Sequence, residues 1–229
     1  MAETRKDQVL ETAEKLFAQK GFAATTMRDL ATAVGVEAAS LYSHIKSKDE
    51  LLETICFGIA EKFVDAIKEV NDIYFSAEEK LRTAIRNHVG IMCSSTSACK
   101  VFMDEWRNLT EPRLTEFKWL RNEYEQGFRD ILQTGEDEGL FNEVDKKFAV
   151  LTILGAMNWI TEWHRPDGGM KPDQIADRLS QFILSGLKKK KPFWGSPPTP
   201  EGGEKSQDEK NNQSQIKPPI CPLGGLGAK

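Results

Sequence analysis

Apolar residues recur at intervals of three and four along most of the 229-residue chain, and no run alternates convincingly with a period of two. Spacings of three and four place side chains on one face of a helix, whereas a half-buried strand needs a period of two. The pattern therefore predicts an all-α fold of about nine helices.

The clearest helix boundaries lie in the first 50 residues. An apolar face that ends at Gly21 indicates a first helix. Thr26 and Asp29, as a shortened capping box, begin a second helix that closes at Gly35, and a third is expected over roughly 38–45. Two short helices joined by a tight turn with glycine predict a helix-turn-helix, although a structural αα-hairpin fits the same periodicity.

Longer helices are expected in the rest of the chain. Ser47 with Glu50 predicts a capped start for the fourth helix. The later helices are expected at about 76–93, 98–109, 112–139, 145–164 and 172–191. Proline, glycine, serine, asparagine and glutamine dominate after that, which predicts a disordered tail. The expected divisions of the chain are thus a three-helix head at 1–48, a helical body at 49–191 and a tail at 192–229.

Charge changes this picture little. The formal net charge is −4, and the acidic excess falls in the middle of the chain. The first 48 residues carry seven basic and six acidic side chains, and residues 188–229 carry eight basic and four acidic ones. An acidic body repels phosphate, so non-specific DNA binding should be weak.

Cysteine usage and the N-terminus indicate a soluble cytoplasmic protein. The four cysteines form no CxxC motif and are not grouped with the three histidines, so we expect free thiols and neither a metal site nor a cofactor. Acidic residues interrupt the N-terminus, which does not resemble a signal peptide. The longest apolar run, 148–157, is too short to span a bilayer.

The third helix has the side chains that a recognition helix needs. Its outer face must be small or polar to approach base edges, while Leu41 is expected to turn inward and pack. Small or polar side chains of this kind are Ala38, Ala39, Ser40, Ser43 and His44.

The N-terminal stretch resembles the tetracycline-repressor-type (TetR/AcrR) transcriptional regulators. The resemblance covers about residues 5–55 and rests on Gly21-Phe22, Thr25-Thr26, Arg28-Asp29-Leu30-Ala31, Val34-Gly35-Val36, Leu41-Tyr42 and Lys46-Ser47-Lys48-Asp49-Glu50-Leu51. It implies a DNA-binding repressor that is released from a near-palindromic operator by a small effector, and it implies no enzyme activity.

The resemblance also implies a set of DNA contacts. Thr26 and Arg28 would bind a phosphate at the start of the second helix, and Tyr42 and Lys48 would reach other phosphates. Bases or nearby sugar-phosphate would be contacted by Ala39, Ser40, Ser43 and His44. Simpler interpretations remain open: Thr26 as a cap only, Tyr42 as core, and Lys48 as a solvated lysine.

One departure from the family lies at the start of the recognition helix. The family commonly places Ser or Thr there, followed by a basic or polar residue, whereas this chain has Glu37-Ala38-Ala39. Glu37 suits a helix N-terminus electrostatically but repels a close phosphate. A two-fold dimer would still require half-sites about one helical turn apart, roughly 34–36 Å, or a multiple.

The resemblance assigns the last two long helices to a homodimer interface. Gly155 and Ala156 would permit close approach of helices there. The other side of the eighth helix is expected to line a cavity, with Arg107, Arg121 or Arg165 at its entrance. Four tryptophans are candidate ligand contacts, with plain core packing as the alternative: Trp106, Trp119, Trp159 and Trp163.

Three segments, 105–109, 135–141 and 158–179, look like the acyl-coenzyme A-responsive subset of the family. An acyl-CoA would suit a tunnel with an apolar end and arginines at its mouth. A cationic drug or dye is the alternative effector, with Glu105 or Glu162 as counter-charge. A remote alternative is a small helical enzyme acting on thioesters, but His88 and Cys93 point about 140° apart on one helix.

Overall fold

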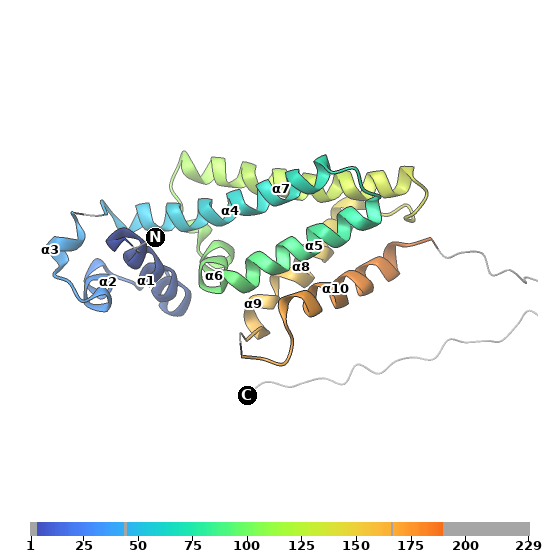
Figure 1. The fold of residues 1–229 in the computed structure, drawn as a ribbon. Helices are drawn as coiled ribbons and strands as arrows, with labels where there is room; N and C mark the ends of the chain where they lie inside the picture. Colours follow the sequence, from blue (N-terminus) through green and yellow to red (C-terminus); the bar gives the residue numbers. More distant parts are fainter. Residues whose placement is uncertain (1–3, 44, 166, 190–229) are drawn as a thin grey trace, which may run out of the picture. The chain divides into compact units, whose positions relative to one another are not determined.

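The computed structural model describes residues 4–189 except 44 and 166, and its regular structure is helical (Figure 1). The extended pairing in this part is one isolated antiparallel bridge, between Phe141 and Lys188. The predicted all-α fold is thus confirmed. None of the helices in the described ranges is long and apolar enough to cross a membrane. The predicted tail at 192–229 lies outside the described residues.

Three short helices form the N-terminal head: α1 (Arg5–Lys20), α2 (Met27–Val34) and α3 (Ala38–Leu41). The third is shorter than predicted. The N–H of Ser43 bonds to the carbonyl of Ser40, three residues back, so the chain turns more tightly than an α-helix after Leu41.

The predicted start and end of α2 are confirmed. The Thr26 side chain accepts from the N–H of Asp29, and the Asp29 carboxylate accepts from the N–H of Thr26. Gly35 ends the helix in the left-handed conformation, with φ 75°, which a residue with a Cβ adopts only at a cost. The turn between α2 and α3 therefore needs glycine at this position.

Helix α4 (Lys48–Asp72) belongs to both the head and the body (Figure 1). The Ser47 side chain accepts from the N–H of Glu50, as predicted. The reciprocal half of the box differs, because the Glu50 carboxylate accepts from the N–H of Lys46 instead of Ser47. Within the body α4 packs against the next two helices along the chain and against the long helix α7 (Arg113–Asp137).

The other body helices are α5 (Ala77–Ser94), α6 (Thr96–Asp104), α8 (Lys146–Asn158), α9 (Ile160–Trp163) and α10 (Pro172–Leu187). Helix α10 lies along α5, and α4 lies along α7 (Figure 1). Two helices predicted as continuous are interrupted. The one expected at 98–109 becomes α6 and a 3-10 turn, η1 (Trp106–Asn108), and the one expected at 145–164 divides at Trp159.

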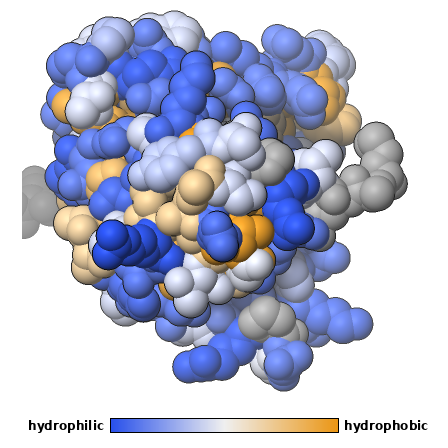
Figure 2. Space-filling model, turned by 90° about the vertical axis from the view of Figure 1, so that its left-hand side faces the viewer, coloured by the Kyte–Doolittle hydropathy of each residue, from blue (hydrophilic) through white to orange (hydrophobic). Residues whose placement is uncertain are grey.

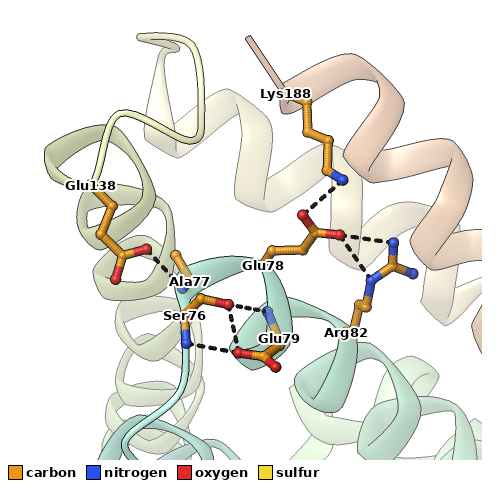
Figure 3. Close-up of polar contacts among 7 residues, drawn as sticks. All are labelled: Ser76, Ala77, Glu78, Glu79, Arg82, Glu138 and Lys188. Carbon is orange, nitrogen blue, oxygen red and sulfur yellow. Dashed lines mark hydrogen bonds and ion pairs between the residues drawn. The ribbon is translucent and has the colours of Figure 1, made fainter.

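The start of α5 is fixed by its own cap and by the end of α7. The Ser76 side chain accepts from the N–H of Glu79, and the Glu79 carboxylate accepts from both the N–H and the hydroxyl of Ser76 (Figure 3). The carboxylate of Glu138, just after α7, accepts from the N–H of Ala77 at 3.0 Å. The helix predicted at about 76–93 thus begins with a complete capping box, which has an additional partner next to α7.

An ion-pair cluster extends this connection to α10. The Glu78 carboxylate accepts from Lys188, just after α10, at 2.7 Å and from Arg82 at 3.0 Å (Figure 3). The hydrogen bond from Lys188 is the main cause that lowers the pKa of Glu78, and Arg82 adds to it. The N-terminus of α5 and the C-termini of α7 and α10 therefore meet at one end of the body.

Near the same end, the Phe141 ring packs directly against the backbone of α7 at Gly135, where a side chain would not fit. A Cβ added to Gly135 would lie 2.0 Å from the Phe141 ring, and Phe141 is itself 1% exposed. Since neither the ring nor the surrounding core has room to move, Gly135 is required by packing and not by backbone conformation.

We expect Gly135→Ala to destabilise the protein by about 2 kcal/mol, because overpacking outweighs the helix propensity that alanine gains. Gly90→Ala is the matched control: Gly90 lies in α5, is exposed, and an added Cβ would meet nothing within 4 Å. It should stabilise by roughly 0.5–1 kcal/mol. Thermal unfolding at a fixed protein concentration checks both, and a Gly135→Ala melting temperature at or above wild type would contradict this packing argument.

Candidate functional site

The head exposes nearly all the residues expected to contact DNA. Tyr42 is 55% exposed, so the interpretation of Tyr42 as a core residue fails, whereas Leu41 is 1% exposed and packs inward as predicted. Hydrophilic residues cover most of the side of the molecule that carries the head (Figure 2). Also exposed are Thr26, Arg28, Ala39, Ser40 and Ser43, at least in part. His44 lies outside the described residues.

The donors of Thr26 are already in use within the head. Its hydroxyl donates to the Asp29 carboxylate at 2.7 Å, and its backbone N–H donates to the same carboxylate at 2.8 Å. These bonds, the hydroxyl first, hold the pKa of Asp29 below its usual value. The structure thus gives Thr26 the role of a cap, and Arg28 is exposed at the start of α2.

Lys48 joins α4 to the turn between α1 and α2. Its ammonium donates to the carbonyls of Phe22 and Thr25, at 2.7 and 2.9 Å, and lies 4.2 Å from the centroid of the Phe22 ring. It is therefore not the solvated lysine of the simplest interpretation. An ammonium has three donors, so one remains for a phosphate.

The end of α6 contacts this same turn. A Cβ on Gly21, which ends α1, would lie 3.4 Å from the Glu105 carboxylate. Glu105 in turn accepts from the side chain of Asn108, in η1, at 2.8 Å. The head thus touches the body through α4 and through α6, against which α1 also packs.

A cavity lies in the body among helices α4, α5, α6, α7 and α8. Its volume is small, about 40 Å³, and it opens to solvent at its mouth. Aromatic rings form much of the wall, and the ring of Phe63 lies 4.6 Å from that of His88 and 5.1 Å from that of Tyr124. The lining residues are Ala60, Phe63, His88, Phe102, Met103, Leu120, Arg121, Tyr124, Glu125, Leu154 and Asn158.

His88 and Tyr124 form a buried polar pair in this wall. The Nδ1 atom of His88 lies 2.8 Å from the Tyr124 hydroxyl. Burial lowers the pKa of His88 to about 3, although the nearby Asn158 side chain raises it, and burial raises the pKa of Tyr124. Both groups are therefore neutral near pH 7. The Nε2 atom of His88 is buried without a hydrogen-bond partner in the described part of the chain.

The buried His88 predicts a loss of stability on acidification. Its folded-state pKa of about 3 lies below the value of 6.5 for a free imidazole, so below pH 6.5 the unfolded chain binds a proton that the folded protein does not. Between pH 8 and pH 5 this should cost about 2 kcal/mol. His88→Phe, which can keep the ring stack, should lack this part of the pH dependence. Urea unfolding of both proteins between pH 8 and pH 5 checks this prediction. If the free energy of unfolding changed equally with pH in the two proteins, the prediction would be contradicted.

Two arginines converge on Trp106 beside the cavity. The guanidinium carbons of Arg107 and Arg121 lie 4.6 and 4.9 Å from the centroid of the Trp106 ring, which also stacks on Phe117. Burial is the main cause that lowers the pKa of Arg121, and the positive charge of Arg107 acts in the same direction. The carboxylate of Glu125, also in the cavity wall, acts in the opposite direction, so an anion here would meet two guanidinium groups and one carboxylate.

The other three tryptophans do not line the cavity. Trp119, Trp159 and Trp163 are 56%, 64% and 41% exposed. Trp119 is exposed because of its position on the helix. It is two residues from the buried Phe117 and therefore lies on the opposite side of α7. Of the predicted ligand residues, only Arg121 lines the cavity, with Trp106 and Arg107 beside it.

The polar wall of the cavity was not predicted from the sequence. The available signal was a lone histidine on an apolar helix face, since His88 follows Leu81, Ala84 and Ile85 at helical spacing. Nothing in the residue pattern indicates that Tyr124 and Asn158, from α7 and α8, would lie close to this histidine.

These features define the class of protein: a helix-turn-helix head on a helical body with a cavity is suited to a DNA-binding regulator that also binds a small molecule. The family model "Bacterial regulatory proteins, tetR family" matches residues 9–55, and "Tetracyclin repressor-like, C-terminal domain" matches residues 74–187. The chain is 32% identical to the TetR-family regulator PfmR of Thermus thermophilus, over 80% of this chain and 100% of that one, with a TM-score of 0.72. The chain belongs to the TetR family of transcriptional regulators.

Two other relatives extend the comparison. The transcriptional repressor KstR2 of Rhodococcus jostii is 28% identical over 80% of this chain and 91% of its own length. AibR, solved in complex with isovaleryl coenzyme A and operator DNA, is 26% identical over 79% of this chain and 98% of that one, with a TM-score of 0.70. The protein is thus a DNA-binding transcriptional repressor of this family. Its relatives are regulators and not enzymes, which sets aside the thioester-processing alternative.

Proposed function

We propose that the protein is a homodimeric repressor whose two heads bind a near-palindromic operator and whose release is triggered by an acyl-coenzyme A. It acts in the bacterial cytoplasm, where the operator is. The head corresponds to residues 1–48 and the ligand-binding and dimerisation body to 49–191. The observation that carries the choice of effector is the pair of guanidinium groups held beside an aromatic cavity.

In the proposed DNA complex α3 enters the major groove. Arg28 and Tyr42 contact phosphates, and Lys48 uses its remaining donor for another. Thr26 supports the phosphate contact as the cap of α2. Bases or sugars are contacted by Ala39, Ser40, Ser43 and His44.

The proposed dimer forms through α8 and α10, which contact each other within one subunit. Phe148, Leu151 and Trp159 form one exposed stripe along α8 and its end, and Phe182 is 77% exposed on α10. Burying a large apolar side chain of this kind contributes about 1.5–3 kcal/mol. Gly155 is exposed within the same stripe and lets a second helix come close.

The proposed effector places its acyl group in the cavity and its phosphates at Arg107 and Arg121. Bidentate bonds from guanidinium to phosphate are strong, and aromatic walls suit an apolar chain. The AibR complex supports an acyl-CoA in a relative. A cationic drug fits less well, because two positive groups already cover Trp106. The carboxylates expected to balance a drug are engaged: Glu105 with Asn108, and Glu162 with Lys100 at 3.4 Å.

We infer that the effector acts on both connections between body and head. The cavity is lined by Phe102 and Met103 of α6 and by Ala60 and Phe63 of α4. A ligand between these helices displaces them, α4 tilts as a lever on the turn held by Lys48, and the two recognition helices leave register with successive major grooves. This requires the ligand to bind the released state more tightly than the DNA-bound state.

The test is a binding panel on the full-length protein, read by thermal shift and tryptophan fluorescence, with acyl-CoA esters, the matching free acids and cationic dyes. A thioester present at 100 times its Kd should stabilise by about 2.7 kcal/mol. Saturable stabilisation by thioesters and not by free acids is the expected result. Stabilisation by dyes alone would make the protein a drug sensor. If no compound stabilised the protein, the proposed effector would be contradicted.

A further inference from the structure

His88 lies in the cavity wall and is held by two neighbouring rings. Its ring stacks on that of Phe63 at 4.6 Å, with an interplanar angle of 23°, and on that of Tyr124 at 5.9 Å and 24°. The residue is 2% exposed. These neighbours come from α4 and α7, so the orientation of the imidazole is fixed before any ligand binds.

The hydrogen bond to Tyr124 decides which nitrogen of His88 carries the proton. The Tyr124 hydroxyl is buried and protonated, and in the described part of the chain its hydrogen bond is the one to Nδ1. If Nδ1 donated, both the phenol proton and the Nε2 lone pair would lack partners. If the phenol donates to Nδ1, only one group lacks a hydrogen-bond partner, the N–H at Nε2. The second arrangement leaves fewer buried polar groups unsatisfied.

That Nε2–H is a donor without an acceptor among the described residues. The atom is buried and unpartnered, and His88 lines the cavity. The side chain of Asn158 lines the same space and interacts with the imidazole, raising its pKa, but Nε2 has no hydrogen-bond partner among the described residues. Buried donors are normally satisfied, so a ligand that brings an acceptor to this point gains a bond that the free protein lacks.

The acceptor must be neutral. The imidazole is uncharged near pH 7, and a carboxylate buried against it would have lost its hydration without gaining a cation. A carbonyl oxygen meets the requirement without that desolvation cost. A thioester carries such an oxygen at the junction between an apolar acyl chain and the charged part of coenzyme A.

We propose that the Nε2–H of His88 donates a hydrogen bond to the thioester carbonyl oxygen of the effector, with Tyr124 fixing the donor tautomer. This assignment rests on the proposed acyl-CoA effector and makes the cavity select thioesters over chains that lack the carbonyl. His88 is thus a specificity-determining residue, and Tyr124 is a positioning residue.

The experiment compares each thioester with a thioether that has CH₂ in place of the carbonyl. The probes are octanoyl-CoA with octyl-CoA and isovaleryl-CoA with isopentyl-CoA, titrated calorimetrically into the full-length protein. Wild type should bind at least one thioester about 10-fold more tightly than its thioether, equivalent to about 1.4 kcal/mol. In His88→Phe this ratio should fall to about one. Leu120→Ala, which changes the apolar wall, should weaken both members of a pair and keep the ratio.

The outcomes separate this inference from the proposed function. Equal binding of thioester and thioether to wild type overturns the role of His88 but leaves the acyl-CoA effector intact, and this comparison needs no variant to fold. A preference that persists in His88→Phe also overturns the inference. Failure of all four probes to bind overturns the proposed effector and this inference with it. Tyr124→Phe should reduce the ratio by less than His88→Phe, and an undiminished ratio contradicts the positioning role.

Discussion

Leu151→Glu should convert the protein to a monomer and lower its operator affinity on the order of 100-fold, because two linked heads bind two half-sites far more tightly than one head binds one. Leu151 is 51% exposed and lies in the stripe with Phe148 and Trp159. In the proposed interface the new carboxylate would be buried against apolar side chains of the partner without a counter-ion. The operator for the measurement is selected from a random DNA pool with the full-length protein.

Ile73→Glu provides the matched control for this change. Ile73 is also an exposed apolar residue, at 40%, but it follows α4 and lies on neither α8 nor α10. Ile73→Glu should leave both the molecular mass of the dimer in solution and the DNA affinity unchanged. Analytical ultracentrifugation and fluorescence anisotropy measure the two quantities. A Leu151→Glu protein that remains dimeric and binds DNA normally would place the interface elsewhere.

Arg121→Met combined with Arg107→Met should weaken octanoyl-CoA binding by about 10- to 100-fold, the range expected for lost hydrogen bonds to a charged group. Methionine retains much of the apolar stem that packs near Trp106, so the loss reports on charge. Stability without ligand is measured alongside, because both guanidinium groups also lie over the Trp106 ring.

Octanoyl-pantetheine, which lacks the nucleotide phosphates, tests whether the two arginines act through phosphate. Its affinity should be nearly the same for wild type and the double variant. Arg86→Met serves as a protein control, because Arg86 lies on α5 with its guanidinium 2.9 Å from the Asp177 carboxylate and does not line the cavity. An equal loss of affinity for both ligands in the double variant would mean that the arginines support the fold of the cavity and do not bind phosphate.

Local signals in the sequence predicted the head well. The reciprocal bonds of Thr26 with Asp29 and the left-handed Gly35 depend on residues within a few positions of each other, so residue type alone indicates them. The interruptions at Glu105 and Trp159 could not be predicted in this way. No glycine or proline marks either position, and the helices end there in the packed body.

The cavity shows where residue type misleads. Tryptophans are suited to ligand pockets, but the helical phase that buries Phe117 and Tyr124 turns Trp119 outward. The pair of His88 and Tyr124 joins residues 36 positions apart on two helices, and only the packing of α5 against α7 brings them together. Lys48 shows the same limit, because its carbonyl partners lie 23 and 26 residues away.

The most direct test of ligand-controlled DNA binding measures operator affinity of the full-length protein with and without saturating octanoyl-CoA or isovaleryl-CoA, and thioester affinity with and without operator. We predict that at least one thioester weakens DNA binding by a factor in the range of about 5–150, and that operator DNA weakens binding of that thioester by the same factor. Equal affinity of the free and the DNA-bound protein for both thioesters would contradict the proposed mechanism.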